Sequence, residues 1–351
     1  MSKRSLRGAA RAGCVALLVL FLWAPSSGAV PLRKIGPASV WTDGARYAAF
    51  FPPEQVWWPQ QVVDERAGRR YSVTPPTVPP GPGFQTPPIC QFYAVAGGSV
   101  LWSCPFGQPP YLLTELATGV TRAVPGWQKL ERSLARFQGD LADLSISVRG
   151  FGRRWLHVQA NVGWHLDLVA NRWLDWHTGT LLQAEPGGRR YVIDLDDPRL
   201  AVPLCPPLRR RIERFEGNGP DLVLPYVYER GWLFNAGYSA QLHAIKIRRC
   251  GHRRPLVVHR CRYVCTGASF GAGYLTWLDE PKFSIYNPTP ISQDQTVVFA
   301  YDVRHDRRFR FQANFGVQHP GYLWHTGKHI YAHTAFVPSP TLYVARLPQL
   351  R

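Results

Sequence analysis

One short pattern recurs along the chain and limits what it can fold into. The pattern is a run of β-forming residues, a turn centred on glycine, and a second run rich in aromatic and β-branched residues. It occurs at residues 40–50, 93–104, 147–158, 226–237, 269–279 and 323–333. The turn glycines are Gly44, Gly98, Gly152, Gly231, Gly273 and Gly327, and three of the five intervals between them span 54 residues. A recurring interval of this length predicts stacked copies of one structural unit.

A second hairpin follows most copies of the first, at residues 61–73, 111–124, 191–204, 242–258 and 297–311. Two hairpins supply four strands, and a four-stranded unit cannot bury both of its faces alone, so such units pack around an axis. We therefore predict an all-β chain that forms a single β-propeller of four-stranded antiparallel blades. An extra hairpin at 172–183 widens the third interval. We interpret it as an insertion, which gives six blades; the alternative, a shortened blade, gives seven.

Two further features complete the expected architecture. Helical periodicity occurs at residues 127–137, where apolar residues recur at three- and four-residue spacing. A pair of β-sandwiches remains the alternative to a propeller.

The hairpins resemble those of secreted β-propellers of the TolB-like and WD40-like kind. Residues 42–47 (TDGARY) look like the "DG-x-x-aromatic" hairpins of these proteins. The resemblance covers residues 30–351 and implies the propeller fold. The Trp-Asp dipeptide that marks true WD40 blades is missing from its expected positions, and a fold shared by many functions implies no activity.

The two ends of the predicted domain can pair with each other in one sheet. The last repeat ends with a strand at 341–347 that lacks an outer neighbour, and residues 31–35 precede the first blade without a partner. We expect the N-terminal strand to pair with the last blade and close the ring, because that pairing removes two exposed sheet edges.

Residues 1–29 have the layout of a secretory signal peptide. Four basic residues precede an apolar run at 14–24, and Ser27, Gly28 and Ala29 supply small residues for cleavage after Ala29. The run is too short for a membrane anchor, which needs about 20 apolar residues. We expect a secreted or extracytoplasmic protein with no transmembrane segment in the mature chain, and a propeller domain at 30–351.

Six cysteines follow the predicted signal peptide, and an even number in an exported chain favours disulfides. Cys90 and Cys104 flank the Gly97-Gly98 turn almost symmetrically. In a regular hairpin they face each other within disulfide range, so we expect a bond between them. The other four allow three pairings, and their spacing selects none of these: Cys205, Cys250, Cys261 and Cys265.

The formal net charge of the chain is +18. Arginines gather at the tips of the second hairpins, which a propeller places on the same face as the turns of the first. The turns of the first hairpins add Arg46, Arg153, Arg154 and Lys328 to this rim. The candidate binding residues of this basic rim are Arg69, Arg249, Arg253 and Arg307. A basic rim attracts polyanions, although turns also carry charge for solubility alone. The expected partner is an anionic polymer or an acidic protein of the cell envelope; export argues against nucleic acid.

Two tryptophans are further binding candidates. Trp57 and Trp58 stand in a loop bounded by prolines, where exposed aromatic rings can stack on sugars.

No catalytic motif is recognisable in the sequence: G-x-S-x-G, H-E-x-x-H and the P-loop are absent. His325 and His329 can meet across a predicted hairpin, but a placed third ligand is lacking, so we predict no metal site and no cofactor. We expect a non-enzymatic binding or scaffold module, without catalytic residues. The alternative is a polysaccharide-acting hydrolase or lyase with paired carboxylates in the central funnel, drawn from Glu115, Asp140, Asp143, Asp167, Asp175 and Glu229.

Overall fold

The structure is a computed structural model of the chain. It describes residues 29–348 apart from 54–56, 80–86, 88, 106–108, 138–143, 163–166, 183–190, 193–201, 204–225, 230–231, 236–241, 250–251, 253, 281–296, 313–314, 316–319 and 335–339. The predicted signal peptide therefore lies outside the described residues except for Ala29. In the described part of the chain, no helix is long and apolar enough to cross a bilayer.

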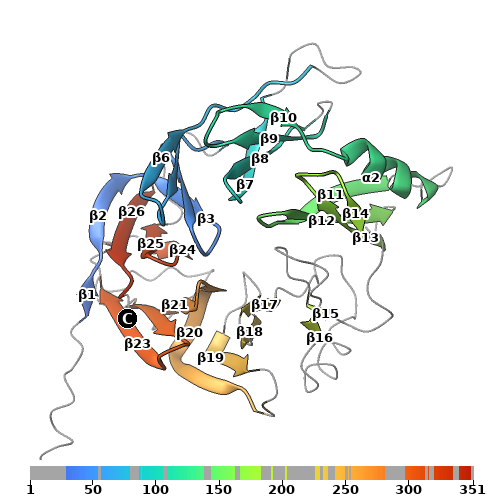
Figure 1. The fold of residues 1–351 in the computed structure, drawn as a ribbon. Coiled ribbons are helices and arrows are strands. Elements are labelled where there is room, and N and C mark those ends of the chain that lie inside the picture. The colour runs from blue at the N-terminus through green and yellow to red at the C-terminus, as the bar shows by residue number, and fades with distance from the viewer. Residues whose placement is uncertain are drawn as a thin grey trace, which may run out of the picture.

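The described fold is all-β and consists mostly of four-stranded antiparallel sheets (Figure 1). The first sheet contains β3 (Ser39–Thr42), β4 (Tyr47–Phe51), β5 (Gln61–Asp64) and β6 (Arg69–Ser72). The second contains β7 (Gln91–Ala96), β8 (Ser99–Ser103), β9 (Tyr111–Glu115) and β10 (Thr121–Ala123). In both, consecutive strands are neighbours, as the two-hairpin repeat predicts.

The third sheet corrects one prediction. It contains β11 (Leu144–Phe151), β12 (Trp155–Val162), β13 (Asp167–Asp175) and β14 (Leu181–Leu182). The hairpin at 172–183 is therefore the second hairpin of this sheet, because β13 pairs with β12 along nearly its whole length, and it is not an insertion. The hairpin at 191–204 forms a separate two-stranded sheet of β15 (Tyr191–Val192) and β16 (Val202–Pro203).

An eight-stranded sheet follows, and one long strand divides it into two halves. Its strands are β17 (Tyr226–Glu229), β18 (Trp232–Asn235), β19 (Leu242–Arg249), β20 (Leu256–Gly271), β21 (Tyr274–Glu280), β22 (Val297–Asp302), β23 (Arg307–Gln312) and β1 (Val30–Pro31). Residues 256–265 of β20 pair with β19, whereas residues 264–271 pair with β21. Strand β20 is therefore the outer strand of one four-stranded group and the inner strand of the next.

The last sheet joins the two ends of the described chain. It contains β24 (Pro320–His325), β25 (His329–Thr334), β26 (Thr341–Arg346) and, as its outer strand, β2 (Arg33–Pro37). The predicted pairing of the N-terminal strand with the last repeat is confirmed by the antiparallel register of β2 and β26. Figure 1 shows the sheets along an arc with the first sheet beside the last, and the described sheets do not form a closed ring.

The predicted helix is present. It comprises α2 (Trp127–Leu134), extended by a 3-10 turn, η1 (Ala135–Phe137), and it buries Trp127, Leu130 and Leu134 against the third sheet. Gly126 precedes the helix with φ +77°, and a Cβ there would lie 2.6 Å from the carbonyl oxygen of Gly179. Glycine is required here for two reasons. The backbone is left-handed, and the turn between β13 and β14 leaves no room for a Cβ atom.

The sheets share one backbone detail that confirms a repeat. The residue after the third strand of a sheet donates its amide to a carbonyl in the turn between the first and second strands. The five described pairs are Glu65 to Arg46, Leu116 to Gly98, Trp176 to Arg154, Val303 to Gly273 and Leu347 to Lys328, at 2.8–3.1 Å. Both turns of each sheet therefore lie at the same end of the sheet.

Apolar side chains fill the spaces between neighbouring sheets. Trp102 and Cys90 belong to a core between the first and second sheets, and Leu156 and Trp176 to one beside α2. Cys90 and Cys104 are bonded to each other, as their positions around the turn predict, and are buried in the first of these cores.

Candidate functional site

When β20 is counted in both halves of the eight-stranded sheet, the described strands form six four-stranded units. In four of these units, an acidic side chain ends the third strand. In register, Asp64 faces Tyr47, Glu115 faces Ser99, Asp175 faces Trp155 and Asp302 faces Tyr274. Each of the three aspartates accepts hydrogen bonds from the backbone amides two and three residues further on, at 2.9–3.3 Å. Short acidic side chains stabilise turns in this way, so these carboxylates hold the second hairpins in shape.

Two of these aspartates also neutralise arginines of the predicted basic rim. Arg46 donates to Asp64 through Nε at 2.8 Å and through Nη2, and Arg154 Nε donates to Asp175 at 2.6 Å. The Arg46 guanidinium lowers the pKa of Asp64. Burial alone would raise the pKa of Asp175, but hydrogen bonds from Arg154 and the turn amides outweigh it and lower the pKa. The first and third sheets therefore each carry one rim arginine in an ion pair.

Two sheet units carry arginine where the others carry an acid. Arg249 faces Trp232 at the end of β19, and Arg346 faces His329 at the end of β26. Both arginines are exposed. At these two strand ends a positive charge therefore stands in the position that a carboxylate occupies in the other four.

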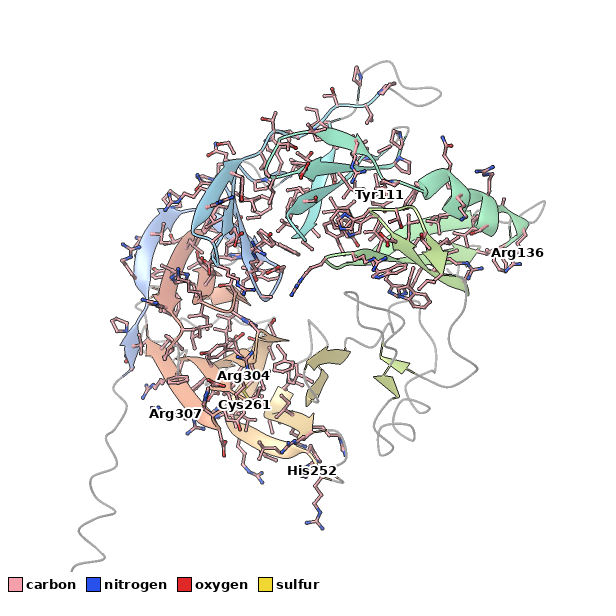
Figure 2. The ribbon with its side chains drawn as sticks, in the orientation of Figure 1. Tyr111, Arg136, His252, Cys261, Arg304 and Arg307 are labelled. Atoms are coloured by element: carbon pink, nitrogen blue, oxygen red, sulfur yellow. A yellow bond between two sulfur atoms is a disulfide. The ribbon has the colours of Figure 1, made fainter. Side chains whose placement is uncertain are left out.

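The predicted rim residues do not all come together. Arg249 and Arg307 are exposed residues of the eight-stranded sheet, whereas Arg69 is an exposed residue of β6, the edge strand of the first sheet. Arg253 lies outside the described residues. Figure 2 shows Arg304, Arg307, Cys261 and His252 around the eight-stranded sheet, on the opposite side of the arc from Arg136.

The two predicted tryptophans lie at the other end of the first sheet, because they stand between β4 and β5. Trp57 is 56% exposed, and its carbonyl accepts a hydrogen bond from the amide of Phe92 at 2.8 Å. Trp58 is half-buried and packs against the core between the first and second sheets. Trp57 is thus accessible to a ligand, while Trp58 has a packing role.

A buried polar cluster joins the first sheet to the last. Glu65 is 5% exposed, and its carboxylate accepts hydrogen bonds from the hydroxyls of Thr326 and Tyr331 and lies 2.9 Å from His329 Nδ1. Burial would raise the pKa of Glu65, but the hydrogen bonds from His329, Thr326 and Tyr331 lower it. Lys328 Nζ lies 3.4 Å from the Glu65 carbonyl oxygen. This cluster is a polar clasp between sheets that are distant in sequence.

The C-terminal histidines do not assemble as a metal site in the described part of the chain. His325 faces Ile330 across the hairpin and is completely buried, and burial lowers its pKa to about 4. His329 belongs to the clasp. His333 is also buried, and burial lowers its pKa too. The prediction that His325 and His329 can meet across the hairpin is wrong, because the register pairs His325 with Ile330.

The richest chemical cluster lies where β20 changes partners. On β19, Ala244 and Leu242 are two residues apart, but their partners on β20, Arg260 and Cys265, are five apart. The surplus residues form a bulge that the bond between Cys261 and Cys265 closes. An extended strand would separate cysteines four residues apart by about 13 Å, whereas the two Cα atoms are 5.6 Å apart. The sequence spacing alone did not select this pairing.

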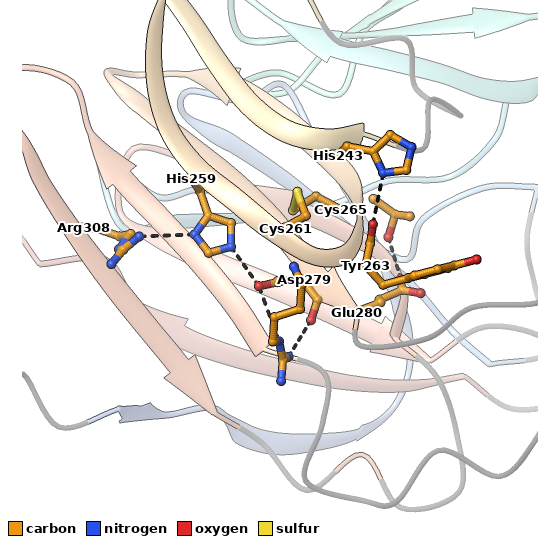
Figure 3. The surroundings of a disulfide bond; sticks show 10 residues. His243, His259, Cys261, Tyr263, Cys265, Asp279, Glu280 and Arg308 are labelled. Carbon is orange, nitrogen blue, oxygen red and sulfur yellow. Dashed lines mark hydrogen bonds and ion pairs between the residues drawn. A yellow bond between two sulfur atoms is a disulfide. The ribbon is translucent and has the colours of Figure 1, made fainter.

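A histidine and an aspartate face the closed bulge (Figure 3). Asp279 lies opposite Cys265 in register, and its Oδ2 is 2.8 Å from His259 Nε2. Its other oxygen accepts the backbone amide of Arg262 at 3.0 Å. Burial would raise the pKa of Asp279, but hydrogen bonds from His259 and Arg262 lower it, so the group is a carboxylate at neutral pH. Sequence analysis missed this pair because 20 residues separate its members.

Basic and aromatic groups surround the same cluster. Arg308 Nη1 lies 3.2 Å from His259 Nδ1, and the Arg308 guanidinium stands over the ring of Phe299 at 5.7 Å. The His259 ring also packs on Trp277 and Phe299. Next to Asp279, Glu280 is buried and accepts a hydrogen bond from Thr266; burial raises the pKa of Glu280.

Among the described residues, one group has metal-ligand geometry: ligand atoms of His259, Cys265 and Asp279 lie within 4.8 Å of one another. Cys265 is bonded to Cys261, so it has no thiolate to offer a metal. Arg262 and Arg308 add positive charge beside His259 and Asp279. The donor set therefore does not suit a cation in the disulfide form.

The acids considered for a catalytic pair have other roles or lie elsewhere. Asp175 is committed to Arg154 and to its turn, and Glu115 is exposed and accepts a hydrogen bond from Thr118. Asp140 and Asp143 lie outside the described residues. The side chains of Asp167 and Glu229 are likewise outside what the structure describes.

Comparison with known proteins gives no assignment. No protein-family model matches the chain, and no curated protein matches its sequence. Among solved structures, TolB from Acinetobacter baumannii is 10% identical with a TM-score of 0.30, over 88% of this chain and 64% of that one. A variant of the AtxE2 isopeptidase with astexin3-dC4 bound is 12% identical with a TM-score of 0.35, over 90% and 51%. The AfRom2 CNH domain is 6% identical with a TM-score of 0.29, over 92% and 97%.

These values limit what the similarities imply. All three TM-scores are below 0.5, and the chain spans less than two thirds of the TolB and isopeptidase chains. Fold and function are therefore argued from this chain's own residues.

Proposed function

We propose that the chain is an exported β-propeller that acts as a binding module and engages an anionic partner through its eight-stranded sheet. The single observation that carries the binding role is an excess of exposed positive charge on that sheet. The converging turns support the propeller, the disulfides support export, and the charge distribution supports the binding surface.

The turns support the propeller. A Cβ on Gly271, in the eight-stranded sheet, would lie 2.5 Å from the carbonyl oxygen of Gly44 in the first sheet, although the last sheet stands between them. Gly327 of the last sheet donates its amide to Ala45 at 2.8 Å. Turns from three sheets thus converge, as inner turns do around a propeller axis. The described strands make six four-stranded units when β20 is shared, and counting β15–β16 as a further unit gives seven.

The disulfides support export. Cys90–Cys104 and Cys261–Cys265 are both formed, and disulfides persist in oxidising compartments outside the cytoplasm. This agrees with the signal peptide expected at residues 1–29.

The charge distribution supports an anionic partner. Among the described residues between 242 and 312, one exposed acid, Asp306, stands against nine exposed arginine and lysine side chains, which we call the basic surface: Lys246, Arg249, Arg254, Arg260, Arg262, Arg304, Arg307, Arg308 and Arg310. The contact of Arg308 with His259 brings the basic residues of β23 next to those of β20. An unbalanced patch of one sign raises the local concentration of oppositely charged ligands.

Charge reversal tests this function. We would measure binding of the mature protein to envelope fractions and to long-chain polyphosphate across a salt series, with Arg260, Arg307 and Arg310 changed to glutamate. An exposed ion pair contributes about 0.2–1 kcal/mol, so losing three predicts roughly 3-fold to 100-fold weaker binding. The salt dependence should also become shallower, because exposed charges are screened.

A matched control separates location from net charge. Arg122, Arg132 and Arg136 are also exposed but belong to β10, α2 and η1. Their reversal changes the net charge equally and should leave most of the binding intact. If both triple variants lose binding to the same degree, net charge alone accounts for it and the basic surface is not the site.

A further inference from the structure

The two described disulfides occupy different environments. Cys90 and Cys104 are both completely buried in the core between the first and second sheets. In the other pair, Cys265 is completely buried but Cys261 is only half-buried, at the edge of a bulge whose tip carries the exposed Arg262 and Tyr263. Cys261 is therefore the more accessible residue of this pair to an incoming thiolate.

The bulge also places charges that suit thiolate chemistry. Arg262 lies within the five-residue ring, and Arg260 flanks it on β20. Cationic neighbours stabilise a thiolate and so lower the pKa of a cysteine thiol. At the buried sulfur, His259 and Asp279 have nitrogen and oxygen atoms within 4.8 Å of Cys265 Sγ, and they share a hydrogen bond of 2.8 Å. A proton donor and a proton acceptor thus stand beside the sulfur that an attack would release.

We infer that Cys261 and Cys265 are a redox-active pair that undergoes thiol–disulfide exchange with dithiol partners at the basic surface. A partner thiolate attacks Cys261 Sγ, forms a mixed disulfide and expels Cys265 as a thiolate, which takes up the proton that the partner's second thiol gives up through the His259–Asp279 pair. The partner's second sulfur, now a thiolate, then attacks the partner's first sulfur in the mixed disulfide. This step releases Cys261 and leaves the partner as a disulfide.

The exchange balances without a cofactor. Two electrons and two protons pass from the partner dithiol to the cysteine pair, and a small-molecule disulfide reoxidises the pair by the reverse steps. His259 and Asp279 are positioning residues that hold and move the proton at Cys265. The inference does not depend on the anionic partner, since it rests on the bulge and not on the net charge of the surface.

The first test uses the second disulfide as an internal control. The folded mature protein is incubated with a graded series of reduced and oxidised glutathione, free thiols are alkylated, and each cysteine is quantified by mass spectrometry. We expect Cys261–Cys265 to be reduced about tenfold or more faster than Cys90–Cys104, because attack requires access to a sulfur. Reduction of both pairs together, and only on unfolding, would overturn the inference.

The second test addresses the asymmetry of the pair. Cys265→Ser leaves a thiol at Cys261, and Cys261→Ser leaves one at Cys265. With oxidised glutathione, we expect a mixed disulfide at Cys261 to form about tenfold faster than one at Cys265. Equal rates would show that neither sulfur is the preferred point of attack, and the proposed order of steps would be wrong.

The third test separates exchange from simple exposure. Asp279→Asn and His259→Gln keep the size of each side chain, and we expect each to slow oxidation of a model dithiol peptide about tenfold. Near-ultraviolet circular dichroism checks that the aromatic packing of Trp277 on Phe299 is kept. Unchanged exchange in these folded variants would remove His259 and Asp279 from the reaction. Equal peptide oxidation by the Cys261→Ser/Cys265→Ser double variant would assign it to the other cysteines and refute the inference.

Discussion

The clasp between the first and last sheets offers the sharpest test of how this fold is held. Glu65 follows the third strand of its sheet, and the equivalent residues of four other sheets are Leu116, Trp176, Val303 and Leu347. All five side chains are buried, so Glu65 is the polar exception at an apolar position. Glu65→Leu restores the pattern of the other sheets and removes the acceptor shared by Thr326 and Tyr331.

The magnitude follows from the groups that lose their partner. Thr326 and Tyr331 are 0% and 3% exposed, so water cannot replace the carboxylate, and each orphaned hydroxyl costs about 1–3 kcal/mol. His329 Nδ1, which faces Glu65, is also buried, although the His329 side chain as a whole is 29% exposed. Burying leucine returns about 1–2 kcal/mol. We expect Glu65→Leu to lower the free energy of unfolding by about 1–4 kcal/mol.

Denaturant unfolding followed by tryptophan fluorescence measures this change, and a second variant tests its cause. Tyr331→Phe removes one orphaned hydroxyl, so Glu65→Leu/Tyr331→Phe should recover about 1–3 kcal/mol relative to Glu65→Leu alone. If Glu65→Leu is as stable as the parent, or if the two changes simply add, the clasp does not hold the sheets together.

The clasp also predicts a dependence on pH. The pKa of Glu65 is lowered in the folded state from an unfolded value near 4.5. Its contribution to stability is therefore present above pH 4.5 and is lost as the pH falls through the folded-state pKa. In Glu65→Leu, the free energy of unfolding should fall less steeply below pH 4.5 than in the parent. Parallel curves of the free energy of unfolding against pH would mean that the charge of Glu65 does not stabilise the folded state.

Three further predictions follow from the fold. Gly126→Ala should lower the free energy of unfolding by more than 1 kcal/mol, measured by denaturant titration, because its Cβ meets Gly179; unchanged stability would refute the close approach. Deletion of residues 30–37 from the mature protein should expose the edge of β26 and promote self-association, and an unchanged monomer fraction by analytical ultracentrifugation would contradict this. His325→Gln should flatten the fall in stability between pH 6.5 and 4, since the unfolded chain binds a proton that the buried His325, with a pKa of about 4, does not; an unaltered slope would exclude His325 as its source.

Local patterns predicted the elements of this chain well. Alternating β-forming residues around Gly44 and Gly98 gave the hairpins, the apolar spacing from Trp127 gave α2, and symmetry about a turn gave Cys90–Cys104. Each of these depends on residues close in sequence, whose spacing directly fixes their geometry.

Assignments that needed several sheets at once were less successful. The prediction of an insertion at 172–183 is wrong because nothing in the sequence of that hairpin indicates which strand it joins; only the pairing of β13 with β12 decides this. Arg46 and Arg154 were assigned to a basic rim, but Asp64 and Asp175 balance them. An alignment of the turns would have exposed Arg249 and Arg346 in the place of an acid, a signal that was available in the sequence.

The repeating hairpins, the helix, one disulfide and the excess of positive charge can all be predicted from the sequence, because each is a local or an additive property. The tertiary structure alone decided that Glu65 meets Tyr331, 266 residues away, and that His259 and Asp279 stand beside Cys265. These contacts depend on how one sheet packs on another and on where β20 bulges. Side-chain partners across such interfaces are set by the three-dimensional register of whole sheets, which no short stretch of sequence encodes.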